Sequence, residues 1–170
     1  MRKSGFWFIY ALLMVAQLLL STYLRVSPYL MLTILPVMVL CISIRNSTAS
    51  TMLIAFVTGL VIDLLSEGML GLNALALVPV AFCRNSIIRL VFGQELFARE
   101  EDFSIQKNGF GKVVLAVLLA QALFLLVYIW VDGAGMRSVS FNALRFAVSL
   151  VAGLLISLLT LSLLAPDTRR

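Results

Sequence analysis

The side chain with the most evident chemical potential is the carboxylate of Asp63, which stands between two hydrophobic runs. If those runs lie in a membrane, an ionised Asp there costs at least about 2.5 kcal/mol, so it needs an ion partner, water or a functional purpose. The surrounding segment, residues 59–77, reads GLVIDLLSEGMLGLNALAL and supplies the small and polar residues nearest to it: Gly59, Ser66, Gly68, Gly71 and Asn73. Such a carboxylate could relay a proton or form an ion pair.

Catalysis and cofactor binding find little support in the residue types. The chain has no histidine, the commonest acid-base and metal-binding side chain. Its serines and threonines occur singly, without a base at a useful spacing, and a proton relay through Asp63 would need further titratable groups across the bilayer. Cys41 and Cys83 lie in hydrophobic runs and are expected to be small core residues. We therefore expect no enzyme, no metal site and no cofactor.

Composition indicates an integral membrane protein. Hydrophobic residues make up 62% of the 170-residue chain and charged residues only 12%. Long unbroken apolar runs predict an all-α membrane protein with a single polytopic domain over residues 1–170. The net charge of +5 is explained by basic residues at the cytosolic membrane surface, so no nucleic-acid partner is expected.

Six apolar runs predict a bundle of six transmembrane helices. They cover approximately residues 5–24, 29–44, 49–65, 72–90, 112–131 and 141–165. Pro36 lies inside the second run, so that helix is expected to be kinked. Ser47 or Thr48 is expected to cap the third helix, and Gln17 and Gln121 are expected to form interhelical hydrogen bonds. The polar stretch of approximately residues 92–111 is expected to be a cytosolic connector.

The distribution of charge predicts which side of the membrane each end occupies. Six spans place both termini on one side, and if that side is the cytosol, ten of the 13 Lys and Arg residues face it. Arg84 and Arg89 are then expected to extend to the cytosolic headgroups. If the second or fourth run were re-entrant instead of spanning, this assignment would fail.

The same topology places Asp63 and Arg145 at similar depth near the outer face, which makes them a candidate ion pair. Ala55, Gly59 and Asp63 recur every four residues and form a small face on the third helix. A matching stripe on the last helix follows Arg145 and consists of Ser149, Gly153 and Ser157. The two faces could pack together. The alternative is that Arg145 extends to the headgroups while Asp63 lies in interfacial water.

The segment 59–77 closely resembles the signature of the MreD family of bacterial rod shape-determining membrane proteins, roughly G-L-x-x-D-x-x-S-x-x-x-x-G-x-x-A-L. Gly59, Asp63, Ser66 and Gly71 match motif positions, Asn73 stands where the family is commonly polar or small, and Glu67-Gly68 departs from the usual Ser-Gly order. The resemblance implies a non-catalytic inner-membrane scaffold of the cell-elongation machinery, or elongasome, that helps couple the cytoskeleton to peptidoglycan synthesis. It also implies partners: first an MreC-like bitopic protein, then RodA with its penicillin-binding transpeptidase and MreB, and membrane lipid. The family is similar in architecture to the S-component fold of energy-coupling-factor vitamin transporters.

That architectural likeness supplies the alternative function, a substrate-binding subunit of a vitamin or small-molecule transporter. Such a subunit would favour a polar pocket built from outer-face loops, and these are short here. It would often carry an Ala-x-x-x-Ala pattern on the first helix, whereas Ala11 and Ala16 are five residues apart. A scaffold needs only a stable bundle with a face for a partner's transmembrane helix. The connector is either a solvated loop or a docking surface.

Overall fold

The apolar runs of the sequence fold into helices, because a backbone in lipid must satisfy its own hydrogen bonds. A computed structural model describes residues 3–23, 30–43, 46–66, 69–93, 109–133 and 137–164, and these contain no strand. The elements are α1 (Lys3–Tyr23), α2 (Leu35–Leu40), α3 (Thr48–Leu65), α4 (Leu72–Phe92), α7 (Phe110–Asp132) and α8 (Val139–Leu164). Most of the expected connector lies outside the described residues.

Four of these helices, α3, α4, α7 and α8, are long and apolar enough to cross a membrane, and α1 contains a shorter apolar stretch, Phe8–Thr22. The protein is therefore an all-α membrane protein, as the composition predicted. The Ser47 cap is confirmed, since its hydroxyl accepts a hydrogen bond from the Ser50 backbone nitrogen at 3.2 Å.

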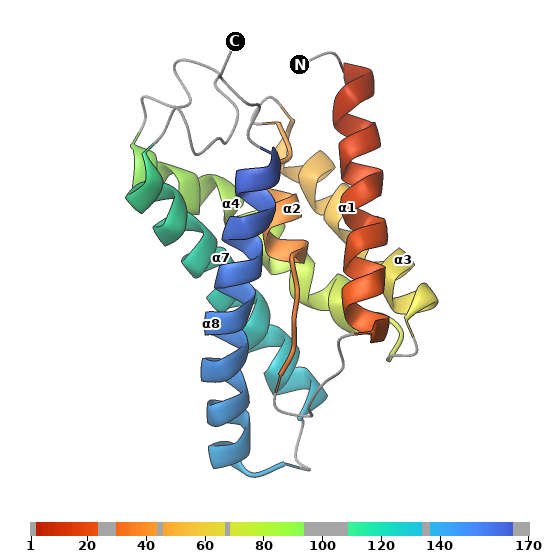
Figure 1. The fold of residues 1–170 in the computed structure, drawn as a ribbon, viewed down its shortest axis with the longest axis vertical. Helices are drawn as coiled ribbons and strands as arrows, with labels where there is room; N and C mark the ends of the chain where they lie inside the picture. Colours follow the sequence, from red (N-terminus) through yellow and green to blue (C-terminus); the bar gives the residue numbers. More distant parts are fainter. Residues whose placement is uncertain are drawn as a thin grey trace.

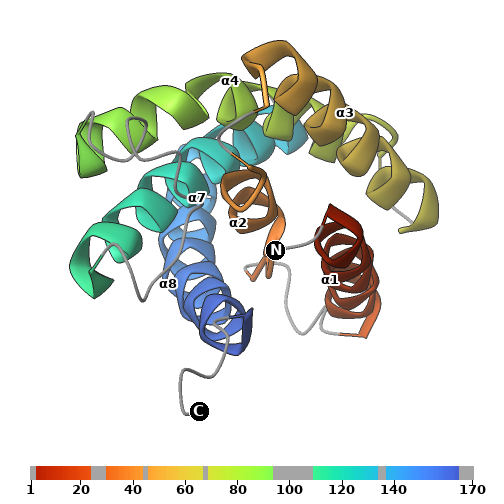
Figure 2. The ribbon, with the colours of Figure 1, turned by 90° about the horizontal axis from the view of Figure 1, so that it is seen from above.

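The long helices surround α2. Helices α3 and α4 form one packed hairpin and α7 and α8 another, and α4 packs against α7 to join them. Figure 2 shows α2 in the middle of the bundle with α1, α3, α4, α7 and α8 around it, and all six residues of α2 are buried. In Figure 1 the start of α1 and the end of α8 lie at the same end of the molecule.

The second run differs from its prediction. A single kinked helix was expected over residues 29–44, but residues 30–34 are not helical and α2 covers only Leu35–Leu40. Pro36 lies in the first turn of α2, where its missing N–H leaves no intrahelical bond unmade, so it begins a helix and does not kink one. Hydrophobicity alone could not make this distinction, because a short apolar run fits both conformations.

Candidate functional site

The carboxylate of Asp63 lies against the start of α4. It accepts hydrogen bonds from the backbone nitrogen of Asn73 at 3.1 and 3.2 Å, from that of Ala74 at 3.2 Å, and from the Asn73 side-chain amide at 2.7 Å. Asn73 and Ala74 are the second and third residues of α4, whose backbone N–H groups lack partners within the helix. Asp63 is 2% exposed. It therefore caps the neighbouring helix with a buried negative charge at the positive end of the helix dipole.

Two glycines allow this contact. Gly71 occupies the N-cap position of α4 with a φ of +88°, a left-handed conformation, and it has no side chain with which to cap the helix itself. A Cβ on Gly59 would stand 2.5 Å from the Ala74 backbone nitrogen and 2.9 Å from the Asn73 carbonyl carbon. Gly59 therefore permits the backbones of α3 and α4 to touch one turn before Asp63, which brings the carboxylate within reach of its donors.

The other residues of the predicted motif take simpler roles. The Ser66 hydroxyl donates to the Ile62 carbonyl at the end of α3, and Ala55 is fully buried on the same face of α3 as Gly59. Gly68 and the neighbouring Glu67 lie outside the described residues. The structure thus brings Gly59, Asp63, Gly71 and Asn73 together at a single junction between α3 and α4.

The expected ion pair between Asp63 and Arg145 does not form. Arg145 instead donates through Nη1 to Asp132 Oδ2, an acid at the end of α7 on its own hairpin. Arg137 contacts the same oxygen at 3.3 Å. The prediction was wrong because it paired two side chains that lie at similar depth in the membrane. In the structure Asp63 bonds to α4, the other helix of its own hairpin, and Arg145 bonds to α7, the other helix of its own hairpin.

The small stripe of α8 also has a different neighbour from the one expected. Ser149, Gly153 and Ser157 are buried, but α8 packs on α7 and on the segment 30–34, not on the small face of α3. A Cβ on Gly153 would stand 3.1 Å from the Gln121 side-chain carbonyl carbon, so this glycine makes room for the Gln121 amide of α7.

Side chains from three helices complete the hydrogen bonds of the non-helical segment 30–34. The Ile34 backbone nitrogen donates to Gln17 Oε1 of α1 at 2.8 Å. The Met31 nitrogen donates to the Ser149 hydroxyl of α8 at 3.0 Å, and Gln121 of α7 donates to the Thr33 carbonyl at 3.4 Å. Non-helical backbone is tolerated at membrane depth when protein supplies its partners in this way. Both glutamines therefore bond to the backbone of this non-helical segment, and not to another helix as expected.

Arg84 was expected to reach the cytosolic headgroups, and the structure corrects this. Its side chain is 1% exposed, and its guanidinium donates to the Ile42 carbonyl just beyond the end of α2. A cation is favourable at the carboxyl end of a helix because the helix dipole is negative there. The sequence signal that could have indicated this role is the position of Arg84 inside an apolar helix, eight residues before its end.

Among the residues that the structure describes, no group of three or more His, Cys, Asp or Glu side chains is placed to hold a metal ion. No protein-family model matches the chain, and searches of curated proteins and of solved structures return no match. The resemblance to the MreD family and the likeness to energy-coupling-factor subunits therefore stay predictions.

Proposed function

We propose that this chain is a non-catalytic scaffold of the bacterial cell-elongation machinery, an MreD-like protein of the inner membrane that helps couple MreB and MreC to peptidoglycan synthesis. The observation that carries the proposal is the geometry of Asp63. Its carboxylate is buried and accepts four hydrogen bonds from Asn73 and Ala74, which engages both of its oxygens. A carboxylate engaged in this way holds two helices in register and is poorly placed to transfer a proton.

The proposed topology has six passes with both termini in the cytosol. The non-helical residues 30–34 and the six residues of α2 together extend about 25 Å, at about 3.3 Å and 1.5 Å per residue, and the residues after α2 lengthen this path. That length approaches the roughly 30 Å hydrocarbon core, so the segment 30–43 serves as the second pass although only part of it is helical. The positive-inside distribution of Lys and Arg supports the orientation.

The proposed partner is an MreC-like bitopic protein, with RodA, its transpeptidase and MreB in the same assembly. A rigid bundle can offer its apolar outer faces to a partner's single transmembrane helix, and the outward positions of α1 and α8, such as Leu12 and Leu155, are apolar and about 60% exposed. These partners come from the motif resemblance alone.

A transporter subunit is the second candidate, and the broken element at the centre favours it. Transporters commonly place substrate sites where a helix is interrupted at membrane depth. Here, however, Gln17, Ser149 and Gln121 use their polar atoms on the backbone of the interrupted segment. This engagement supports a structural role for the interruption.

Depletion of the protein in its native host tests the two candidates together. Cells that widen and become round, with or without added vitamins, would support the scaffold. Cells of unchanged shape whose growth is rescued by one vitamin would refute it and favour the transporter subunit. In the complemented strain, Asp63→Ala is expected to fail to restore shape. Asn85→Ala is a matched control, because it removes a neutral hydrogen bond to Thr48 elsewhere between α3 and α4. Membrane levels of both variants are measured in parallel.

A further inference from the structure

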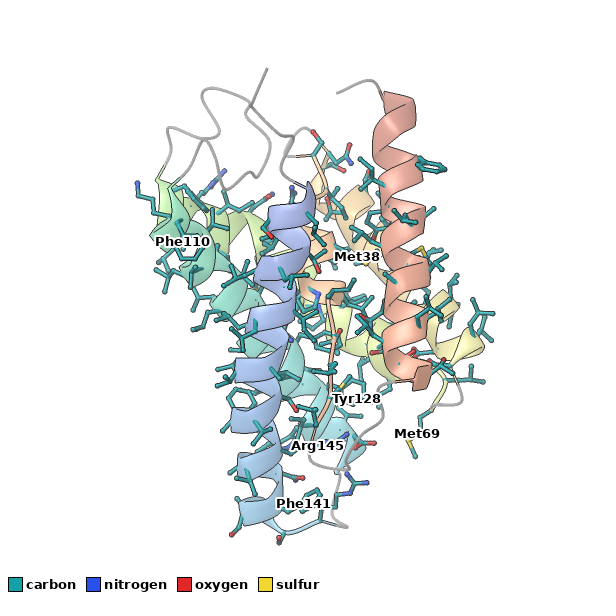
Figure 3. All side chains as sticks on the ribbon, viewed as in Figure 1. Met38, Met69, Phe110, Tyr128, Phe141 and Arg145 are labelled. Atoms are coloured by element: carbon teal, nitrogen blue, oxygen red, sulfur yellow. The ribbon has the colours of Figure 1, made fainter. Side chains whose placement is uncertain are left out.

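Three charged side chains meet where α7 turns into α8. Asp132 is the last residue of α7, and its Oδ2 accepts from both Arg137, at 3.3 Å, and Arg145. The side chains of Asp132 and Arg145 are 19% and 12% exposed, whereas that of Arg137 is 41% exposed. Figure 3 shows Arg145 near this end of the molecule, with Phe141 farther toward the tip of α8.

The charges in this cluster do not balance. Two guanidinium groups share one carboxylate, and neither α7 nor α8 contains another acid. One positive charge is therefore in surplus, beside the amino-terminal and positively polarised end of α8. The Arg145 Nε atom is buried and has no hydrogen-bond partner in the described structure. Two guanidinium groups carry ten N–H donors, far more than one carboxylate can accept.

Exposed apolar side chains lie near the cluster in the sequence, together with the exposed polar residues Ser138 and Ser140. Trp130 at the end of α7 is 74% exposed, and Val139 and Leu144 on α8 are 80% and 54% exposed. Exposed tryptophan is typical of the headgroup level of a membrane, and the apolar side chains continue from there along the helices. The surplus charge thus lies at the point where a lipid headgroup would meet the protein, above a surface suited to its acyl chains.

We propose that Arg137 and Arg145 bind the phosphate of an anionic phospholipid headgroup at this site. Guanidinium groups bind phosphate oxygens through paired hydrogen bonds. A net negative headgroup also neutralises the positive charge of the two arginines that Asp132 does not balance. A zwitterionic headgroup carries the same phosphate but brings its own cation, so it binds more weakly. The proposal concerns lipid binding and holds whether or not the chain is a scaffold of cell elongation.

The test uses the full chain purified in a neutral detergent, with bound lipid counted by native mass spectrometry during titration. Phosphatidylglycerol is expected to bind more tightly than phosphatidylcholine. Arg137→Gln is expected to weaken phosphatidylglycerol binding by about fivefold, the effect of one basic residue near an anionic headgroup. Arg137 is the better variant because it is more exposed than Arg145 and its loss leaves Arg145 paired. Lys112→Gln removes one exposed charge at the opposite end of α7 and is expected to weaken phosphatidylglycerol binding less than Arg137→Gln does.

Asp132→Asn distinguishes a lipid-binding role of this cluster from a purely structural role of its ion pairs. Removal of the competing carboxylate leaves both guanidinium groups without an acid partner, while that of Arg137 still lies over the Phe141 ring. Phosphatidylglycerol binding is therefore expected to tighten even if the protein unfolds more easily. Equal binding by wild type and Arg137→Gln, or weaker binding by Asp132→Asn, would overturn the proposal. Millimolar inorganic phosphate that displaces bound phosphatidylglycerol would also overturn the proposal, because the site would then recognise a free anion.

Discussion

Replacement of Asp63 by alanine removes the cap of α4 and is expected to lower the free energy of unfolding by about 3 kcal/mol. Loss of a helix cap alone costs up to about 2 kcal/mol. Hydrogen bonds to a charged acceptor contribute about 1.5 to 3 kcal/mol each, and those made to one carboxylate do not add independently. The backbone donors of Asn73 and Ala74 would remain buried without a partner, which places the expected cost above that of an ordinary exposed cap.

Asp63→Asn keeps the shape of the side chain and removes its charge, so it measures the contribution of the charge to stability. The carboxamide keeps one oxygen for the backbone donors, and the Asn73 side chain can rotate so that its own oxygen, unpartnered in the described structure, accepts from the new amide. The hydrogen bonds then go to a neutral acceptor, and the interaction of the charge with the helix dipole is lost. The expected cost is about 1 kcal/mol.

Thermal unfolding in detergent, followed by tryptophan fluorescence, measures both variants. For a chain of this size a loss of 3 kcal/mol corresponds to a decrease in Tm of about 6 to 12 °C. Asn85→Ala, which removes one partly buried neutral hydrogen bond between α3 and α4, is expected to cost about 1 kcal/mol. If Asp63→Ala were no more destabilising than Asn85→Ala, the carboxylate would not be the cap that we infer.

Four further substitutions test the packing by the same measurement. Gly59→Ala is expected to cost about 1 to 3 kcal/mol because the new methyl group meets backbone. Gly111→Ala, with open space around it, should be neutral or slightly stabilising, and equal effects at the two glycines would contradict the close approach. Gln17→Leu leaves the Ile34 nitrogen without its acceptor and should cost about 1 to 3 kcal/mol, whereas an unchanged Tm would show that this contact contributes little. Gly71→Ala forces a side chain into a left-handed conformation and should cost about 1 to 2 kcal/mol, and a stabilising effect would contradict the positive φ.

The sequence indicated the junction between α3 and α4 but not what its parts do. Asp63, Gly59 and Gly71 stood out because a carboxylate and glycines are unusual between apolar runs. Their common purpose depends on Asn73, ten residues after Asp63, whose backbone nitrogen carries the interaction. Backbone donors are the same in every residue, so composition and spacing cannot single them out, although a polar residue in the first turn of a helix is a usable signal.

The segment 30–43 shows a different limit of sequence reasoning. Its apolar residues predicted a membrane helix, and its hydrophobicity gives no sign that residues 30–34 depart from helical structure. What stabilises that departure lies far away in the chain, in Gln17, Gln121 and Ser149. Local propensity describes a segment by itself, and this segment owes its conformation to neighbours from three other helices.

The order in which these neighbours are synthesised matters for how the protein enters the membrane. Gln17 emerges from the ribosome before Ile34, so one backbone donor of the central segment can find its acceptor at once. The donor of Met31 must wait for Ser149, 118 residues later. A nascent chain that ends before α8 therefore contains backbone N–H groups to which lipid offers no hydrogen-bond acceptor. The insertion machinery is expected to retain the segment 30–43 until the last helix has been made.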